Sequence, residues 1–140
     1  MKFLKITSMA LMCVVLFGCD NSNKVKTPDK ADLTKLQDLV ISEAKKVLPA
    51  KVDSNTSLVD IFKDNDVINY RYTINVSKDS LQIPETEKMT TESLKKVYCS
   101  NNQQIKEFRD AFPNGAVHSY YINDEKIFSV TLTPASCNTN

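Results

Sequence analysis

The apolar positions after residue 32 change their spacing several times, and each spacing predicts a different element. Between Leu33 and Leu48 they recur every three or four residues, as on one face of an amphipathic helix. Asp29 or Asp32 can cap this helix, and Pro49 would end it. We expect its apolar side to pack on the same domain, because its polar side mixes acidic and basic residues. The apolar stripe comprises Leu33, Leu36, Leu39, Val40, Ala44, Val47 and Leu48.

Alternation of apolar and polar residues then replaces the helical spacing. It predicts strands at residues 56–62 and 67–76, on either side of a turn-rich tetrapeptide. The two strands should form an antiparallel hairpin with one buried and one solvated face. We place Tyr70 and Tyr72 in the core rather than on a stacking platform for bases or sugars. In the second strand one face carries Ile68, Tyr70, Tyr72, Ile74 and Val76, and the other carries Val67, Asn69, Arg71, Thr73 and Asn75.

From Glu85 onward the spacing is helical again. A first helix should end at residues 100–102, a Ser-Asn-Asn segment that can also cap a second helix. Residues 113–115, Pro-Asn-Gly, end the second helix with turn chemistry. The expected apolar stripes are Met89, Leu94, Val97 and Tyr98 in the first helix, and Ile105, Phe108 and Phe112 in the second.

A second hairpin is predicted at residues 116–122 and 126–133, joined by a turn at residues 123–125. In the last strand Phe128, Val130 and Leu132 alternate with hydroxyl residues. For the strand before it, the pattern leaves open whether Val117 and Tyr121 or Tyr120 and Ile122 are buried.

The order of elements predicts the fold class. One helix, a hairpin, two helices and a second hairpin are typical of an α+β domain. We therefore predict an antiparallel sheet of about four strands, made of two hairpins, with the helices packed on one face. A single domain of this kind would occupy residues 31–140.

The N-terminus has a different pattern. Lys2 and Lys5 precede an apolar run at residues 6–17, which would form a helix of about 18 Å. The hydrocarbon core of a bilayer is about 30 Å thick, so this run is too short to span it. A basic head followed by a short apolar segment is typical of an export signal.

The end of this run, Leu16-Phe17-Gly18-Cys19, resembles the lipobox of bacterial lipoproteins. The resemblance implies cleavage before Cys19, a diacylglyceryl thioether on its sulfur and acylation of the new amino terminus, with palmitate as a typical acyl chain. Residues 1–18 would then be a lipoprotein signal peptide. Residues 19–30 would be the lipidated cysteine and a flexible tether, because they are polar and without periodicity.

The lipobox resemblance also implies a location. Several acyl chains hold a protein stably on a membrane, whereas one chain does so only marginally. In enteric-type bacteria, aspartate directly after the acylated cysteine favours retention in the inner membrane. Asp20 and Asn21 stand at these positions. The expected location is the bacterial cell envelope, facing the periplasm and anchored in the inner rather than the outer membrane.

Composition limits the partners and cofactors of the mature chain. Removal of residues 1–18 takes away Lys2 and Lys5, so the formal charge changes from +1 to −1. A near-neutral chain has no basic field for nucleic acid. Gly115 is the one glycine left, which excludes a glycine-rich phosphate loop. We expect no cofactor.

The cysteines predict one disulfide. Cys13 lies in the signal and Cys19 is the lipidation site, which leaves Cys99 and Cys137 in an oxidising compartment. A bond between them would close a loop of about 38 residues and stabilise the fold by about 3–4 kcal/mol. A reactive thiol pair or a metal site fits less well, because there is no C-x-x-C motif and His118 is the single imidazole.

No residue pattern indicates catalysis. His118 is expected to be structural or at the surface, and no serine lies in a nucleophile-elbow context. Residues 64–66, Asp-Asn-Asp, lack the glycine and terminal glutamate of a calcium loop and are interpreted as a turn. Arg71, between Asn69 and Thr73 on the polar strand face, is the best candidate for a contact with a protein edge or a carboxylate.

We therefore expect a non-enzymatic binding module. Small lipoproteins with one disulfide and an α+β domain resemble accessory factors of the envelope, such as secretion-system pilotins, in architecture alone. Such a protein would bind an envelope protein in assembly or secretion. The alternative is an immunity or exclusion lipoprotein that inhibits a toxin, a phage or a conjugation component. An envelope hydrolase is disfavoured by the missing catalytic groups.

Overall fold

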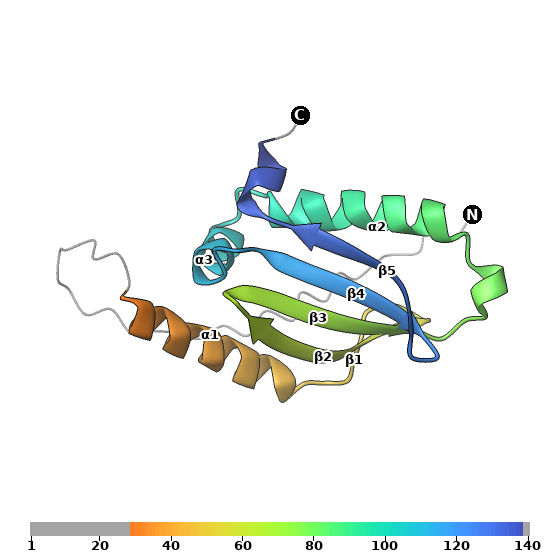
Figure 1. Cartoon of the computed structure of the whole chain (residues 1–140), viewed down its shortest axis with the longest axis horizontal. Coiled ribbons are helices and arrows are strands. Elements are labelled where there is room, and N and C mark those ends of the chain that lie inside the picture. The colour runs from red at the N-terminus through yellow and green to blue at the C-terminus, as the bar shows by residue number, and fades with distance from the viewer. Residues whose placement is uncertain (1–28, 139–140) are drawn as a thin grey trace, which may run out of the picture.

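The computed structural model describes residues 29–138, which form a five-stranded sheet with three α-helices (Figure 1). The lipobox and tether residues, Leu16, Phe17, Gly18, Cys19, Asp20 and Asn21, lie outside this range. The elements in chain order are α1 (Lys30–Lys45), β1 (Ala50–Lys51), β2 (Thr56–Asp64), β3 (Val67–Ile74), η1 (Lys78–Ser80), α2 (Ile83–Tyr98), α3 (Gln103–Ala111), β4 (Ala116–Ile122), β5 (Glu125–Leu132) and η2 (Pro134–Cys137).

The sheet corrects part of the predicted fold. Its strand order is β1-β2-β3-β4-β5, and the pair β3–β4 is parallel while the other pairs are antiparallel. The α+β class and both hairpins are confirmed, but four antiparallel strands were wrong. The helices α2 and α3 return the chain to the end of the sheet where β3 begins, so Ala116 pairs with Ile68 and β4 runs in the same direction. β1 has only two residues, too few to show a period.

Each hairpin closes through a two-residue turn. Asn65 and Asp66 have φ of 48° and 61°, and Asn123 and Asp124 have φ of 48° and 64°. Two successive positive φ angles are typical of type I′ turns, whose twist matches that of the flanking strands. Asn and Asp adopt this conformation more readily than other non-glycine residues. The turns therefore lie where the sequence predicts them, but they are shorter, because β2 extends to Asp64 and β5 begins at Glu125. At their other ends β3 and β5 stop at Ile74 and Leu132, before the predicted residues 76 and 133.

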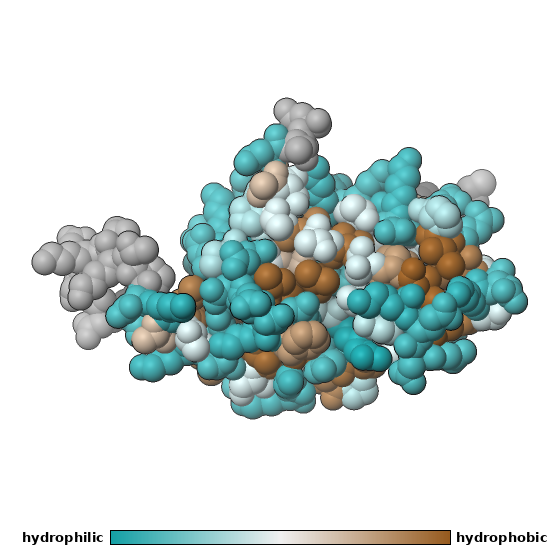
Figure 2. All heavy atoms as spheres, viewed as in Figure 1, coloured by the Kyte–Doolittle hydropathy of each residue, from teal (hydrophilic) through white to brown (hydrophobic). Residues whose placement is uncertain are grey.

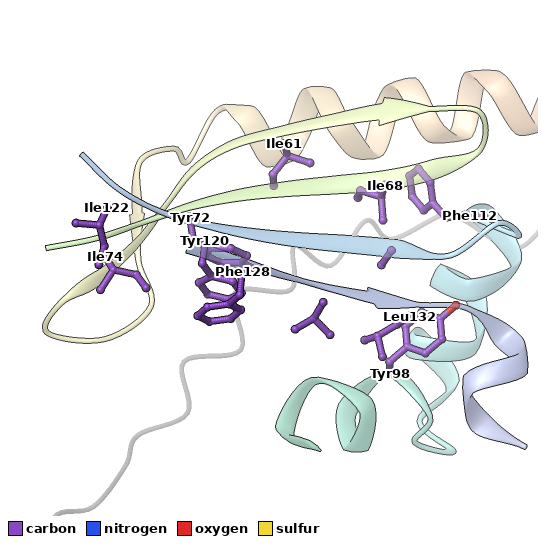
Figure 3. Packing of buried hydrophobic residues seen from close by; sticks show 13 residues of the cluster. Ile61, Ile68, Tyr72, Ile74, Tyr98, Phe112, Tyr120, Ile122, Phe128 and Leu132 are labelled. Carbon is purple, nitrogen blue, oxygen red and sulfur yellow. The ribbon is translucent and has the colours of Figure 1, made fainter. Parts of the chain in front are cut away.

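The core lies on one face of the sheet, called the inner face below. Tyr72 is buried, and Tyr70 is partly buried and packs against the same core, which confirms their predicted place. In β4 the buried pair is Tyr120 and Ile122, which resolves the open alternative. The rings of Tyr72, Tyr120 and Phe128 form a stacked row across three strands, with 4.6 Å between the centroids of neighbouring rings (Figure 3).

All three helices contribute to this core. In Figure 1, α1 runs along the β2 side of the sheet, α2 runs along the β5 side, and α3 lies at one end. Val40 and Ala44 of α1, Leu94 of α2 and Phe108 of α3 pack against the buried cluster. None of the helices within residues 29–138 has both the length and the apolar character needed to cross a lipid bilayer.

The predicted apolar stripe of α2 was wrong in two positions. Met89 and Val97 are 61% and 58% exposed, whereas Ile83, Leu94 and Tyr98 face the core. Neighbouring residues in a helix are about 100° apart, so Val97 and Tyr98 cannot both point at the same sheet. Thr86, Glu87, Thr90 and Thr91 are partly buried as well, and these polar residues hid the true stripe in the sequence pattern.

A polar residue of α1 holds three elements together. The Gln37 side chain is almost fully buried; its amide nitrogen donates to a carboxylate oxygen of Asp66 at 3.0 Å and to the carbonyl of Ala111 at 2.8 Å. These bonds connect α1 with the β2–β3 turn and the end of α3. The sequence alone does not indicate this role, because a lone glutamine inside a helix has no distinguishing pattern.

The predicted disulfide between Cys99 and Cys137 is confirmed. Cys99 follows α2, Cys137 ends η2, and their Cα atoms are 5.3 Å apart. The bond ties the end of α2 to the segment after β5.

Gly115 has φ of +105°, and a Cβ atom there would lie 2.1 Å from the carbonyl oxygen of Leu132. Only glycine fits where the chain enters β4.

Candidate interaction surface

The outer face of the sheet consists of the side chains that alternate away from the core. Strand register places Asp60, Arg71, Ser119 and Ser129 in one row across β2 to β5. A second row contains Phe62, Asn69, Val117 and Thr131, and a third contains Thr73, Tyr121 and Lys126. Arg71 therefore lies on the face where the sequence analysis placed it, near the middle of the sheet.

Arg71 is held in place by a neighbouring ring. Its guanidinium carbon lies 4.1 Å from the centroid of the Tyr121 ring, and one of its terminal nitrogens lies 3.4 Å from a carboxylate oxygen of the exposed Asp124. Lys126 also approaches this ring, at 5.9 Å. A cation over an aromatic face is attracted by the ring quadrupole, which holds the guanidinium over Tyr121. Its remaining N–H groups can donate to a carboxylate or to backbone carbonyls.

The charges around Arg71 have both signs. Lys78 and Glu125 form an ion pair at 2.5 Å, and Lys45 lies 3.7 Å from Asp60. Exposed pairs of this kind contribute little to stability because water screens them. They are typical of the polar rim of a protein interface.

The hydrophobic residues at the surface are dispersed. In the view of Figure 2 they form separate patches over the middle of the sheet and near one end of α2, with polar residues between them. Phe62, on β2, is an exposed aromatic residue of the outer face. Non-obligate interfaces are similarly mixed and are no more apolar than the rest of a protein surface.

His118 lies on the inner face, opposite to Arg71. Its ring is buried and stacked on Tyr70 with 4.6 Å between centroids, and its Nδ1 shares a hydrogen bond of 3.0 Å with the Tyr72 hydroxyl. Burial disfavours the charged imidazolium and lowers the pKa of His118 to about 4. The ring is therefore neutral at pH 7. This agrees with the expected structural role of a lone histidine.

Other candidate groups also have structural partners. Asp66, in the predicted turn, accepts from Gln37, and Asn114 donates to the carbonyl of Asn65. Within residues 29–138, no group of three or more His, Cys, Asp or Glu side chains could hold a metal ion. Arg109 donates to the carbonyls of Tyr98 and Ser100 and thereby caps the end of α2.

The structure adds two members to the predicted contact site. Neither Tyr121 nor Asp124 stands out in the sequence, because the pattern leaves open whether Tyr121 is buried together with Val117, and Asp124 is part of a predicted turn. The alternation of β3 gave the side of Arg71, but only the pairing of β3 with β4 brings the tyrosine beneath it.

Comparison with known proteins gives relatives in sequence and in fold. No family model matches the chain. Protein K of Escherichia coli is 32% identical over 103 residues, which are 73% of this chain and 55% of that protein. The chain therefore spans about half the length of this relative.

Two solved structures share the fold. The first is a protein from Pseudomonas aeruginosa described as secreted, with a TM-score of 0.63 and 9% identity over 82% of this chain and 99% of that chain. The second is the pilotin of the type 2 secretion system of Vibrio vulnificus, with a TM-score of 0.56 and 14% identity over 79% of this chain and 96% of that chain. At these identities the likeness is one of fold: both proteins have nearly their whole length in common with the described domain.

Proposed function

We propose that this protein is a lipid-anchored accessory protein of the bacterial envelope whose folded domain binds another envelope protein. The observation that carries the proposal is the similarity of fold to a secretion-system pilotin, which extends over 96% of that chain. Because almost the whole pilotin corresponds to this domain, the similarity is one of complete domains. A binding role without catalysis agrees with the side chains of the outer face, which are arranged to form hydrogen bonds.

The partner would bind to the outer face around Arg71. The guanidinium is fixed on Tyr121 and therefore loses little conformational freedom on binding. Strand register places the hydroxyl residues Ser119 and Ser129 in the same row as Arg71, and Thr73 in the next row. A protein segment that carries a carboxylate would replace Asp124, whose side chain is solvent-exposed, as the partner of Arg71.

The membrane anchor would be Cys19. Ten or so residues separate it from α1, and a fully extended tether of that length spans at most about 35 Å. The domain would therefore work close to the membrane surface. Asp20 and Asn21 would keep the protein in the inner membrane, as proposed from the lipobox resemblance.

Site-specific photo-crosslinking in cells tests the partner and the surface together. A photoreactive phenylalanine at Ser129, on the outer face, should give one dominant crosslinked envelope protein. The same residue at Lys96, exposed on α2, serves as the control for position. Mass spectrometry of the crosslinked product identifies the partner. A toxin or a phage or conjugation component in this product would favour the inhibitory alternative over assembly.

A variant that removes the charge of Arg71 tests whether the crosslink at Ser129 depends on this residue. Arg71→Ala should reduce the yield of the Ser129 crosslink at least fivefold, because the partner loses a charge-assisted hydrogen bond of about 1.5–3 kcal/mol. Lys88→Ala removes one positive charge from the exposed side of α2 and should leave the yield unchanged. Equal crosslinking from Ser129 and Lys96, or no effect of Arg71→Ala, would contradict the proposed surface.

Metabolic labelling tests the anchor. Cells supplied with an alkyne analogue of palmitate should label the protein, and Cys19→Ala should abolish the label. Cys13→Ala, which changes a cysteine within the proposed signal, should keep it. A chain that carries no lipid and is recovered from the soluble fraction would contradict the anchor, while the binding surface would still be tested by crosslinking.

A further inference from the structure

A cavity of about 170 Å³ lies between the inner face of the sheet, α2 and α3. Leu132 of β5 and Tyr98 of α2, which lie next to each other in Figure 3, form part of its wall. Val97, 58% exposed, also lines the cavity, so the opening reaches the surface beside this residue. The lining residues are Tyr70, Leu94, Val97, Tyr98, Ile105, Phe108, Ala116, His118 and Leu132.

The size of the cavity is that of a small ring. An apolar cavity of about 150 Å³ in a protein core stays free of water and binds benzene. A slightly larger and partly open cavity accommodates one aromatic ring with a single substituent. Four of the nine lining residues carry rings themselves, namely Tyr70, Tyr98, Phe108 and His118. Offset or edge-to-face packing with these rings favours an aromatic occupant over an aliphatic one.

The chemistry of the lining also limits the charge of the occupant. None of the nine residues is an acid, a lysine or an arginine, and burial keeps the His118 ring neutral at pH 7. A charged ligand would lose its hydration without an opposite charge to compensate. The Nδ1 of His118 already shares a hydrogen bond with Tyr72, so Nε2 is the ring nitrogen left to meet a ligand.

We propose that this cavity binds one small neutral aromatic molecule, whose polar substituent forms a hydrogen bond with Nε2 of His118. The site lies on the inner face and is separate from the outer surface around Arg71, so it is a second binding function. A hydroxyl substituent suits either tautomer of the imidazole, because it can both donate and accept.

Phenol and toluene form a matched pair of probes, because each has seven non-hydrogen atoms and they differ in the hydroxyl. Titration of the untagged, ¹⁵N- and ¹³C-labelled chain with phenol should give saturable shifts in the methyl signals of Leu94, Ile105 and Leu132. A ligand of this size should bind with a dissociation constant on the order of 1 mM or below. His118 is the only histidine, so its ring nitrogens give one set of signals. Phenol should shift Nε2, whereas toluene should shift the methyl groups alone.

Variants at the opening test the location. Val97→Trp places a large ring over the cavity and should weaken binding of both probes at least tenfold. Val52→Trp makes the same change at a position that is 59% exposed and outside the lining, and should leave binding within twofold. Leu94→Phe fills the cavity from within and should weaken binding in the same way as Val97→Trp.

The proposal is overturned if neither probe gives saturable shifts, or if Val97→Trp and Leu94→Phe both leave binding unchanged. Equal effects of phenol and toluene on Nε2 would refute the hydrogen bond to His118 and with it the proposed polar substituent. Arg71→Ala should not change phenol binding. The proposal for the cavity and the proposal for the outer surface can therefore be refuted independently of each other.

Discussion

Both faces of the sheet carry aromatic residues, but these residues have different surroundings on the two faces. On the inner face, Tyr72, Tyr120 and Phe128 stack on one another out of contact with water. On the outer face, Tyr121 is only partly buried and supports the guanidinium of Arg71. The first arrangement stabilises the fold through burial of apolar area, and the second fixes a charged group at the surface, where we propose that a partner binds. In this sheet, the side on which an aromatic residue lies thus decides whether it packs in the core or supports a polar group at the surface.

Two phenylalanines allow the most direct test of this difference. Phe112 has no exposed surface, and Phe62 of the outer face is 44% exposed. Phe112→Ala should lower the free energy of unfolding by about 3–5 kcal/mol, because it leaves a cavity under the sheet. Phe62→Ala should cost less than about 1 kcal/mol. Urea denaturation of both variants measures the difference, and similar losses would mean that the outer face is also part of the core.

The disulfide should have the next largest effect. The Cys99→Ser/Cys137→Ser variant should lose about 3–4 kcal/mol of stability, because the unfolded chain regains the freedom of a loop of about 38 residues. Denaturation of the wild type with and without reductant gives the same comparison without substitution. Hydrogen exchange should then show increased opening at β5 and at the end of α2 before other elements. Uniform loosening of the sheet would argue against a local role for the bond.

Acidification should lower the free energy of unfolding, because His118 on the inner face is held neutral in the folded chain. Its pKa is about 4 in the folded chain and about 6.5 in the unfolded chain, so below pH 6.5 the unfolded state binds the additional proton. This contribution to stability is present above pH 6.5, decreases as the pH falls and is lost below pH 4. Between pH 7 and pH 4.5 the loss from this residue should be about 2–3 kcal/mol.

A double variant separates this effect from the titration of carboxylates. Tyr72→Phe/His118→Phe removes the imidazole and its hydrogen-bonding partner together, so no buried hydroxyl is left without a bond. The pH dependence of its unfolding free energy should be shallower than that of the wild type by the amount given above. Parallel curves for the two proteins would show that His118 takes up its proton normally in the folded chain.

The smallest expected effect concerns Tyr98. Its hydroxyl is the one buried side-chain oxygen or nitrogen in residues 29–138 that lacks a hydrogen-bond partner. Burial raises the pKa of this tyrosine, and the nearby Arg109 opposes the shift. Tyr98→Phe should stabilise the chain by up to about 1 kcal/mol, since it removes an unsatisfied polar group and keeps the ring. On the outer face, Tyr121→Phe should leave stability unchanged. A loss of stability in Tyr98→Phe, measured by thermal unfolding, would indicate a bound water at this hydroxyl.

The sequence predicted much of the local structure because its signals are local. Alternation in β3 gave the side of every residue from Val67 to Ile74, and the turn-rich residues 63–66 and 123–125 gave both hairpin turns. The stripe of α2 failed because Met89 and Val97 are apolar but face solvent, while threonines occupy the buried side. Gln37 was missed for a related reason: its bonds to Asp66 and Ala111 join residues that are far apart in the chain.

The sequence by itself determined the α+β class, the two hairpins, the disulfide pair and the outward direction of Arg71. These depend on residue periods, turn chemistry and cysteine count, which act over a few residues or by elimination. The tertiary structure alone decided that β4 pairs in parallel with β3, that Tyr121 lies under Arg71 and that a cavity opens beside Val97. Each of these depends on which elements become neighbours, and that choice minimises the free energy of the whole core rather than of any single segment.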